Sequence, residues 1–135
     1  MSDQQEKYFD LVTNGIGYLS RVRDVRVSEG EGTFPCLTIA AIRGKSDDVK
    51  YTHFECTVAG KRALETIDLL RNFVKGNRKV LIGFTLSDIH SQGFIFQKGK
   101  HEGKPGVCLK ARLIRLPWAK VDGNVVYDVR RQAVA

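Results

Sequence analysis

The chain has 135 residues, 42% of them hydrophobic, and a formal net charge of +7. This length and apolar content suffice for one domain with its own core, so folding should require neither disulfides nor structural metals. The sequence contains no signal-peptide pattern and no apolar run of membrane-spanning length. We therefore expect a soluble, cytoplasmic protein without a membrane partner.

Basic charge is concentrated in the second half of the chain. Residues 1–60 carry 7 Lys and Arg against 9 Asp and Glu, whereas residues 61–135 carry 15 against 6, a net charge of +9. A basic surface of this kind favours a polyanionic partner. The alternative is that these side chains only keep one face of the protein in solution.

The first part of the chain predicts an arm followed by three strands. Residues 1–13 carry little periodicity and are expected to form an N-terminal arm. Alternating side chains then predict strands over residues 15–27, 34–43 and 51–59. The third strand has one apolar and one polar face, which indicates that one side packs on a core while the other faces water.

The second part of the chain predicts a helix and then further strands. Four apolar residues at helical spacing mark one buried stripe, namely Ala63, Ile67, Leu70 and Val74. After this helix we predict a strand over residues 79–86 and a last strand over residues 107–116. Between them lie a turn over residues 87–93, the apolar residues 94–96 and a loop over residues 97–106.

The order of these elements predicts the fold. Three strands, one helix and two more strands are typical of a small closed barrel that holds nucleic acid. We therefore predict an all-β domain with one helix over residues 14–120. A short C-terminal tail should follow over residues 121–135.

A basic hairpin flanked by aromatic residues is the strongest functional signal. Aromatic faces stack on bases and cations follow the phosphates, so this combination favours single-stranded nucleic acid bound without base readout. The alternative is that the aromatic residues belong to the core and the lysines only solubilise a hairpin. The candidate binding residues are Phe94, Phe96, Lys98, Lys100, Lys104, Lys110, Arg112 and Trp118.

Two further groups lie on the predicted strands. Tyr51 and His53 share the polar face of the third strand, where an exposed ring could stack on a base or simply form a cross-strand pair. Arg21 and Arg23 share one face of the first strand and are expected to extend the phosphate track.

The sequence offers no recognisable catalytic or metal-binding motif. Asp88 and His90 are close in sequence, but hydrolysis of phosphodiesters usually needs several carboxylates that converge on metal ions. We therefore expect no enzyme, no cofactor and no bound metal. The three cysteines lie in separate apolar segments and are expected to be reduced core thiols, namely Cys36, Cys56 and Cys108.

Several stretches resemble the bacterial single-stranded-DNA-binding protein (SSB) family. They are GYLSRV, LTIAAIRG, YTHFECTVAGKRAL and VKGNRKVLIGFTL, and the most specific parts are Gly60-Lys61 and Lys75 to Leu81. A nearer likeness, through GIGYLSRVRDV, SDDVKYTHFECTVAG, RKVLIGF and KARLIRLPWAKVDG, is to small SSB-like replication-associated proteins carried on integrative conjugative elements.

The resemblance implies an OB-fold, a five-stranded Greek-key barrel with its helix between strands 3 and 4. It also implies a homo-oligomer, with a tetramer favoured and a dimer possible. His53 and Ala59 stand where the SSB family places a stacking Trp and a stacking Phe. Other aromatic residues would then supply the surface on which bases stack. Phe84 joins the candidates given above for this reason.

The leading hypothesis is a largely sequence-independent single-stranded-DNA-binding protein that coats or protects strands during replication, recombination or conjugative transfer of a mobile element. An OB-fold module that docks on replication or conjugation proteins, with weak DNA affinity, is the first alternative. An RNA-binding protein is the second. The chain ends in VVYDVRRQAVA and lacks the acidic tip of the SSB family, so recruitment through such a tip is not expected.

Overall fold

The structure is a computed structural model that describes residues 11–27, 30 and 32–129. In chain order its elements are β1 (Val12–Arg26), β2 (Thr33–Lys45), β3 (Asp48–Val58), α1 (Lys61–Lys75), β4 (Val80–Ile95), β5 (Pro105–Val121) and β6 (Asn124–Asp128). Within these described ranges, no helix has the length and apolar character needed to cross a membrane. Residues 11–13 are the described part of the predicted arm, and Val12 and Thr13 begin β1, whereas residues 1–10 lie outside the described residues.

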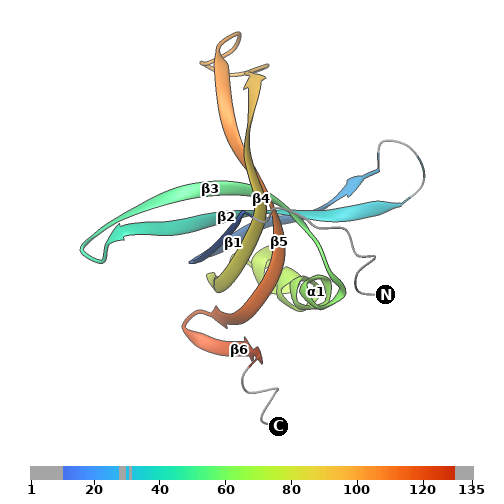
Figure 1. Cartoon of the computed structure of the whole chain (residues 1–135), viewed down its shortest axis with the longest axis vertical. Coiled ribbons are helices and arrows are strands. Elements are labelled where there is room, and N and C mark those ends of the chain that lie inside the picture. The colour runs from blue at the N-terminus through green and yellow to red at the C-terminus, as the bar shows by residue number, and fades with distance from the viewer. Residues whose placement is uncertain (1–10, 28–29, 31, 130–135) are drawn as a thin grey trace, which may run out of the picture.

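Five of the strands close into a barrel. Antiparallel pairing joins β3 to β2, β2 to β1, β1 to β4 and β4 to β5, and β5 then pairs in parallel with β3. The closing seam runs from the pair Phe54 and Leu109 to the pair Val58 and Leu113. With α1 between β3 and β4, this is the predicted OB-fold, and the fold prediction is confirmed (Figure 1).

Alternating apolar residues of the barrel strands form the core. Side chains such as Leu37, Ile82 and Leu113 are fully buried, as the period of two in each strand requires. The helix adds Ile67 and Leu70 to the same cluster, which confirms its predicted apolar stripe. The core therefore fills the barrel and extends to the inner face of α1.

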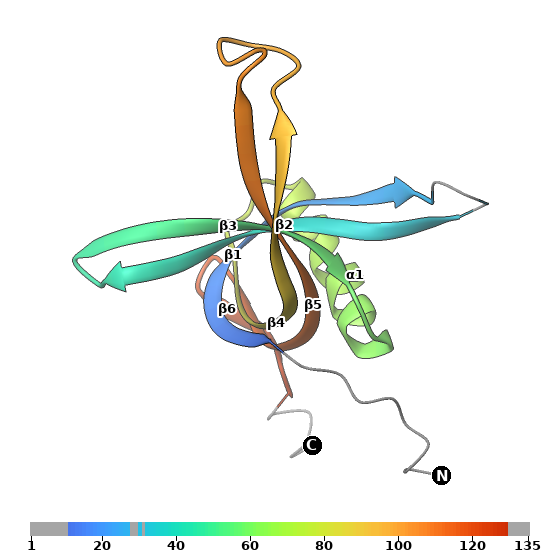
Figure 2. The same cartoon turned by 45° about the horizontal axis from the view of Figure 1, so that its top comes forward.

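Three long hairpins extend from this barrel in different directions. They are the β1–β2, β2–β3 and β4–β5 hairpins, and Figures 1 and 2 show them radiating from the point where the strands cross. Each hairpin continues beyond the barrel wall. Side chains from several strands therefore face the surface between two neighbouring hairpins.

The turn predicted at residues 87–93 is wrong. β4 runs without interruption from Val80 to Ile95. Its register against β5 shifts between Ser87 and His90, and Asp88 has a positive φ of 54°. This is a β-bulge, which allows a strand to bend and continue. The polar residues read as a turn lie on a hairpin that faces solvent on both sides, so they do not disfavour a strand there.

The C-terminal part of the fold is also larger than predicted. β5 continues to Val121, beyond the predicted end at residue 116, and β6 pairs with it within the segment read as a tail. Tyr127 of β6 is buried against the barrel core. The last residues of the predicted tail, 130–135, lie outside the described residues.

Candidate nucleic-acid interface

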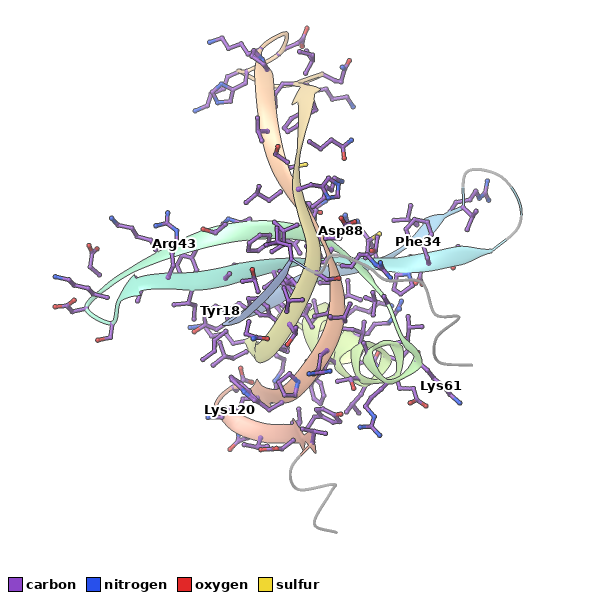
Figure 3. The ribbon with its side chains drawn as sticks, in the orientation of Figure 1. Tyr18, Phe34, Arg43, Lys61, Asp88 and Lys120 are labelled. Atoms are coloured by element: carbon purple, nitrogen blue, oxygen red, sulfur yellow. The ribbon has the colours of Figure 1, made fainter. Side chains whose placement is uncertain are left out.

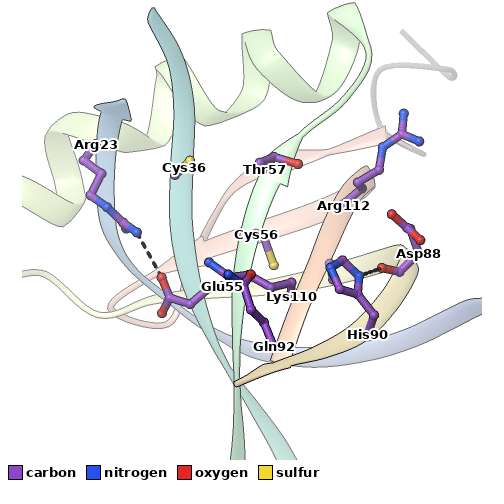
Figure 4. Close-up of a pocket in the computed structure, with 11 residues that line it drawn as sticks. Arg23, Cys36, Glu55, Cys56, Thr57, Asp88, His90, Gln92, Lys110 and Arg112 are labelled. Atoms are coloured by element: carbon purple, nitrogen blue, oxygen red, sulfur yellow. Dashed lines mark hydrogen bonds and ion pairs between the residues drawn. The ribbon is translucent and has the colours of Figure 1, made fainter. Parts of the chain in front are cut away.

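A cleft lies where the β1–β2 and β4–β5 hairpins leave the barrel. Its volume is about 340 Å³, and side chains from all five barrel strands line it (Figure 4). The sequence places them there because outward residues of β3 and β5 alternate with core residues. The polar lining residues are Arg23, Cys36, Glu55, Thr57, Asp88, His90, Gln92, Lys110 and Arg112.

Two β-bulges shape the cleft from opposite sides. In β1 the register shifts between Ser20 and Arg23, and Arg21 has a φ of 51°. In β4 the matching irregularity lies at Asp88, before His90. A bulge inserts one extra residue and re-aims the side chain that follows it. Arg23 and His90, each placed just after its bulge, both line the cleft.

Glu55 is the centre of a polar network at one wall of the cleft. The Arg23 guanidinium donates to one Glu55 carboxylate oxygen at 2.9 Å, and the Thr38 hydroxyl donates to the other at 2.8 Å. A second Arg23 nitrogen donates to the Arg21 carbonyl oxygen at 2.9 Å. Burial tends to raise the pKa of Glu55, but these hydrogen bonds and the charge of Arg23 outweigh it and lower that pKa below its ordinary value.

The neighbouring strand β5 contributes two further cations to the cleft, Lys110 and Arg112. Lys110 and Arg112 lie beside Glu55 and Thr57 in the parallel β3–β5 register. Among the described residues neither cation forms an ion pair. His90 Nδ1 donates to the Asp88 carbonyl oxygen at 2.8 Å, so the other nitrogen of the neutral ring is an acceptor. Lys110 and Arg112 can supply positive charge and hydrogen-bond donors to an anion in the cleft.

An aromatic cluster continues from the cleft along the β4–β5 hairpin. The rings of Phe94 and Phe96 meet edge to face with centroids 4.8 Å apart, and His101 lies 5.5 Å from Phe96. Both phenylalanines lie over Gly106, where a Cβ atom would approach each ring to 2.7 Å. Phe94 is 40% exposed, so one face of the cluster is open to solvent.

Three lysines lie at the tip of the hairpin, beyond this cluster. Lys98, Lys100 and Lys104 are all exposed. The tip is closed by backbone hydrogen bonds from Phe96 to Lys104 and from Gly103 to Phe96. The predicted aromatic and cationic residues of this hairpin are therefore close to one another, as a stacking and phosphate-binding surface requires.

Other predicted residues lie elsewhere. Phe84 is only 3% exposed, and a Cβ atom at Gly15 would lie 2.8 Å from its ring, so it is a core residue and has no free stacking face. Trp118 is half-buried over Gly83, with the Lys120 ammonium 5.7 Å from its ring. Figure 3 shows Lys120, which lies two residues beyond Trp118 on β5, well away from Asp88 of the cleft. This tryptophan is therefore remote from the cleft.

Three predicted residues lie beside the cleft without lining it. Tyr51 and His53 are exposed on the outer face of β3, which they share with Glu55 and Thr57 of the cleft wall. The exposed Arg21 contributes its carbonyl oxygen to the network, and the cleft lining includes Arg23 instead.

The sequence reasoning missed His90 and Gln92 because it read their segment as a turn. The available signal was the spacing of two that His90, Gln92, Phe94 and Phe96 share, which predicts one face of a single strand. Their register partners on β5 confirm this face, since Gln92 pairs with Cys108 and Phe94 with Gly106.

The cysteines are free in the structure. Cys56 is a buried core thiol, and burial raises its pKa to about 12. Cys36 and Cys108 are only half-buried, so they are not core residues in the predicted sense. In the part of the chain that the structure describes, no three His, Cys, Asp or Glu side chains gather as metal ligands would.

The sequence matches a protein family over nearly its whole length. The model of a family described as "Protein of unknown function (DUF3577)" matches residues 2–135. No curated protein and no solved structure matches the chain.

Proposed function

We propose that this chain, which belongs to the DUF3577 family, is a single-stranded DNA-binding protein that grips the strand largely without reading its sequence. The observation that carries the proposal is the continuity of one surface. On β4 the outward residues His90, Gln92 and Phe94 pair with Lys110, Cys108 and Gly106 of β5, so the cationic cleft and the aromatic cluster share one face.

The chemistry of this surface suits an unpaired strand. Lys110 and Arg112 can bind phosphates electrostatically, and the open face of Phe94 can stack on any base. OB-folds bind oligonucleotides on the face that their β1–β2 and β4–β5 loops flank, and the cleft occupies this position. Neither kind of contact distinguishes one base from another, so affinity should exceed specificity.

The motifs shared with the bacterial SSB family support a wider role. We propose that the protein coats strands exposed during replication, recombination or conjugative transfer of a mobile element, and that it does so as a homo-oligomer. Phe84 takes no part in this proposal because it is buried. In place of Phe84, the Phe94 and Phe96 rings stack on bases and the cations of the cleft bind the phosphates.

A second candidate is a docking module for replication or conjugation proteins. The observation that favours it is the opposite face of the same hairpin, where Ile95 is 52% and Val107 is 70% exposed. Exposed apolar residues on a projecting hairpin are a feature of protein contact sites.

Titration of a fluorescein-labelled oligothymidine at two salt concentrations tests the proposal. We expect tight binding at low salt that weakens steeply as salt rises, because the protein displaces counterions. Lys110→Ala/Arg112→Ala should reduce the affinity and make the salt dependence shallower, by a slope of about 0.7 for each phosphate that the variant no longer neutralises.

The matched control is Lys61→Ala/Lys75→Ala, which removes the same charge from α1. It should bind nearly as the wild type does. No binding at low salt would refute the proposal, and capture of a replication protein in that case would favour the docking module. A matched oligouridine competitor distinguishes DNA from RNA preference.

A further inference from the structure

A second hollow lies on the barrel near the start of β4. Its volume is about 370 Å³, and it is lined by Tyr18, Tyr51, Arg78 and Lys79 above the apolar pair Leu19 and Val80. The two tyrosine rings have centroids 6.4 Å apart and are tilted by 51°. Tyr51 is 46% exposed, so the hollow presents an aromatic wall to solvent.

The loop at the edge of this hollow is held in place by Asp122. The Arg78 guanidinium donates to one Asp122 oxygen at 2.6 Å, and the Lys79 backbone N–H donates to the other at 3.1 Å. Arg78 also lies over the Phe73 ring at 5.5 Å. These contacts occupy Arg78, whereas the exposed Lys79 side chain forms no ion pair among the described residues.

We propose that this hollow is a second base-binding subsite for the same single strand, with the Tyr18 and Tyr51 rings against a base and Lys79 on a phosphate. The inference rests on the proposed function and extends it to a second site. Two aromatic rings beside one available ammonium group provide both contacts that a nucleotide of a single strand needs.

The outer face of β3 connects the two sites. Tyr51, His53, Glu55 and Thr57 alternate along it. Tyr51 in the hollow and Thr57 in the cleft are therefore about 20 Å apart along the strand. In the sheet register, Tyr18 and His53 both pair with Ala40 and therefore face the same side. A strand that leaves the cleft can follow this face directly to the tyrosines.

The only acidic side chain among these four outward β3 residues is Glu55, and its charge is balanced. It accepts from Arg23 at 2.9 Å and from Thr38 at 2.8 Å. The half-buried guanidinium–carboxylate pair presents little net charge to a passing phosphate. His53 lies between the two sites, where its ring can contact the strand.

Oligonucleotide length tests the inference, because OB-folds have site sizes of about 4 to 16 nucleotides. Tyr18→Leu/Tyr51→Leu keeps apolar bulk but removes both rings. We expect it to weaken binding of an oligothymidine of about 16 nucleotides by about five-fold or more, and to leave binding of one of about four nucleotides nearly unchanged. The short strand should occupy the more strongly charged cleft.

The matched control is Tyr51→Phe, which keeps the ring and should bind like the wild type. Circular dichroism of each variant checks the fold. If the tyrosine variant binds both lengths like the wild type, or loses the same factor with both, the second subsite is refuted.

Photocrosslinking gives a readout that does not depend on affinity. An oligonucleotide carrying 5-iodouracil should crosslink to Tyr18 or Tyr51 as well as to the β4–β5 hairpin, as located by mass spectrometry of the digested protein. Crosslinks confined to the cleft and that hairpin would refute the second subsite while leaving the proposed function intact. Failure of the wild type to bind any oligonucleotide would overturn both.

Discussion

The inner and outer parts of the β4–β5 pair differ in what surrounds them, although the same two strands form both. Val80 to Leu86 of β4 and Ala111 to Val121 of β5 lie in the barrel wall, where most of their side chains are buried or half-buried. Beyond the bulge at Asp88, β4 leaves the barrel, and its residues from His90 to Ile95 are exposed on both faces. Apolar residues therefore stabilise the fold in the inner part and are available for contact in the outer part.

A large difference in stability is expected between two apolar residues of β5. Leu113 is fully buried, whereas Val107 is 70% exposed. Leu113→Ala should reduce the free energy of unfolding by about 2–5 kcal/mol because it leaves a cavity. Val107→Ala should change it by about 0.5 kcal/mol or less. Urea denaturation measures the free energy of unfolding of both variants. Similar losses of stability would contradict the distinction between the inner and outer parts of the β4–β5 pair.

Two phenylalanines of β4 sharpen the comparison further. Phe84→Ala should cost about 3–5 kcal/mol of stability, since its ring is in the core. Phe94→Ala should leave stability nearly unchanged and weaken oligothymidine binding by about 1–3 kcal/mol, the usual contribution of one stacked base. If denaturation and titration show that Phe94→Ala loses stability but retains affinity, Phe94 is a structural residue instead.

Two glycines under aromatic rings are expected to differ more modestly. A Cβ atom at Gly83 would lie 2.5 Å from the Trp118 ring, and one at Gly106 would lie 2.7 Å from Phe94 and Phe96. Gly83→Ala should destabilise the barrel by about 1–3 kcal/mol through overpacking. Gly106→Ala should tilt the Phe94 and Phe96 rings on the outer hairpin, with little effect on thermal unfolding and a measurable change in oligonucleotide affinity. A larger loss of stability in Gly106→Ala would contradict this view.

The smallest effect concerns pH at the border between the two parts. Glu55 has a lowered pKa in the folded protein, so its contacts contribute stability above the unfolded pKa of about 4.5, and this contribution is lost as pH falls through the folded value. Glu55→Gln should therefore flatten the decline of unfolding free energy between about pH 5 and pH 3, approximately the range in which carboxyl groups titrate. An unchanged decline would show that other carboxyl groups determine it.

The sequence predicted the barrel well because buried faces produce a periodic pattern of apolar residues in it. Leu37 and Ile39 alternate with more polar neighbours, and Ile67 and Leu70 recur at helical spacing, so strands and helix were recognisable. The outer hairpin produces a weaker pattern, because neither face is buried and only the spacing of two shared by His90, Gln92 and Phe94 marks the strand. Polar residues around Asp88 therefore looked like a turn, although the strand continues through a bulge.

The candidate site was predicted less completely, for a related reason. Charge and aromatic content identified Lys110, Arg112 and Phe94 without any knowledge of neighbours. Arg23 and Glu55 are 32 residues apart, and only the paired strands and their bulges bring them into contact. Phe84 and Phe94 have the same side chain, and only the path of β4 determines that one is buried and the other exposed.

The parallel β3–β5 seam has a consequence for how the protein folds. Phe54 and Leu109 meet there across the helix and the whole of β4, so this pairing closes a long loop and is entropically costly to form early. Glu55, Thr57, Lys110 and Arg112 become neighbours only when this seam closes. Stopped-flow refolding with a labelled oligonucleotide should therefore show binding competence appearing with the last folding phase, after the local β2–β3 hairpin has formed.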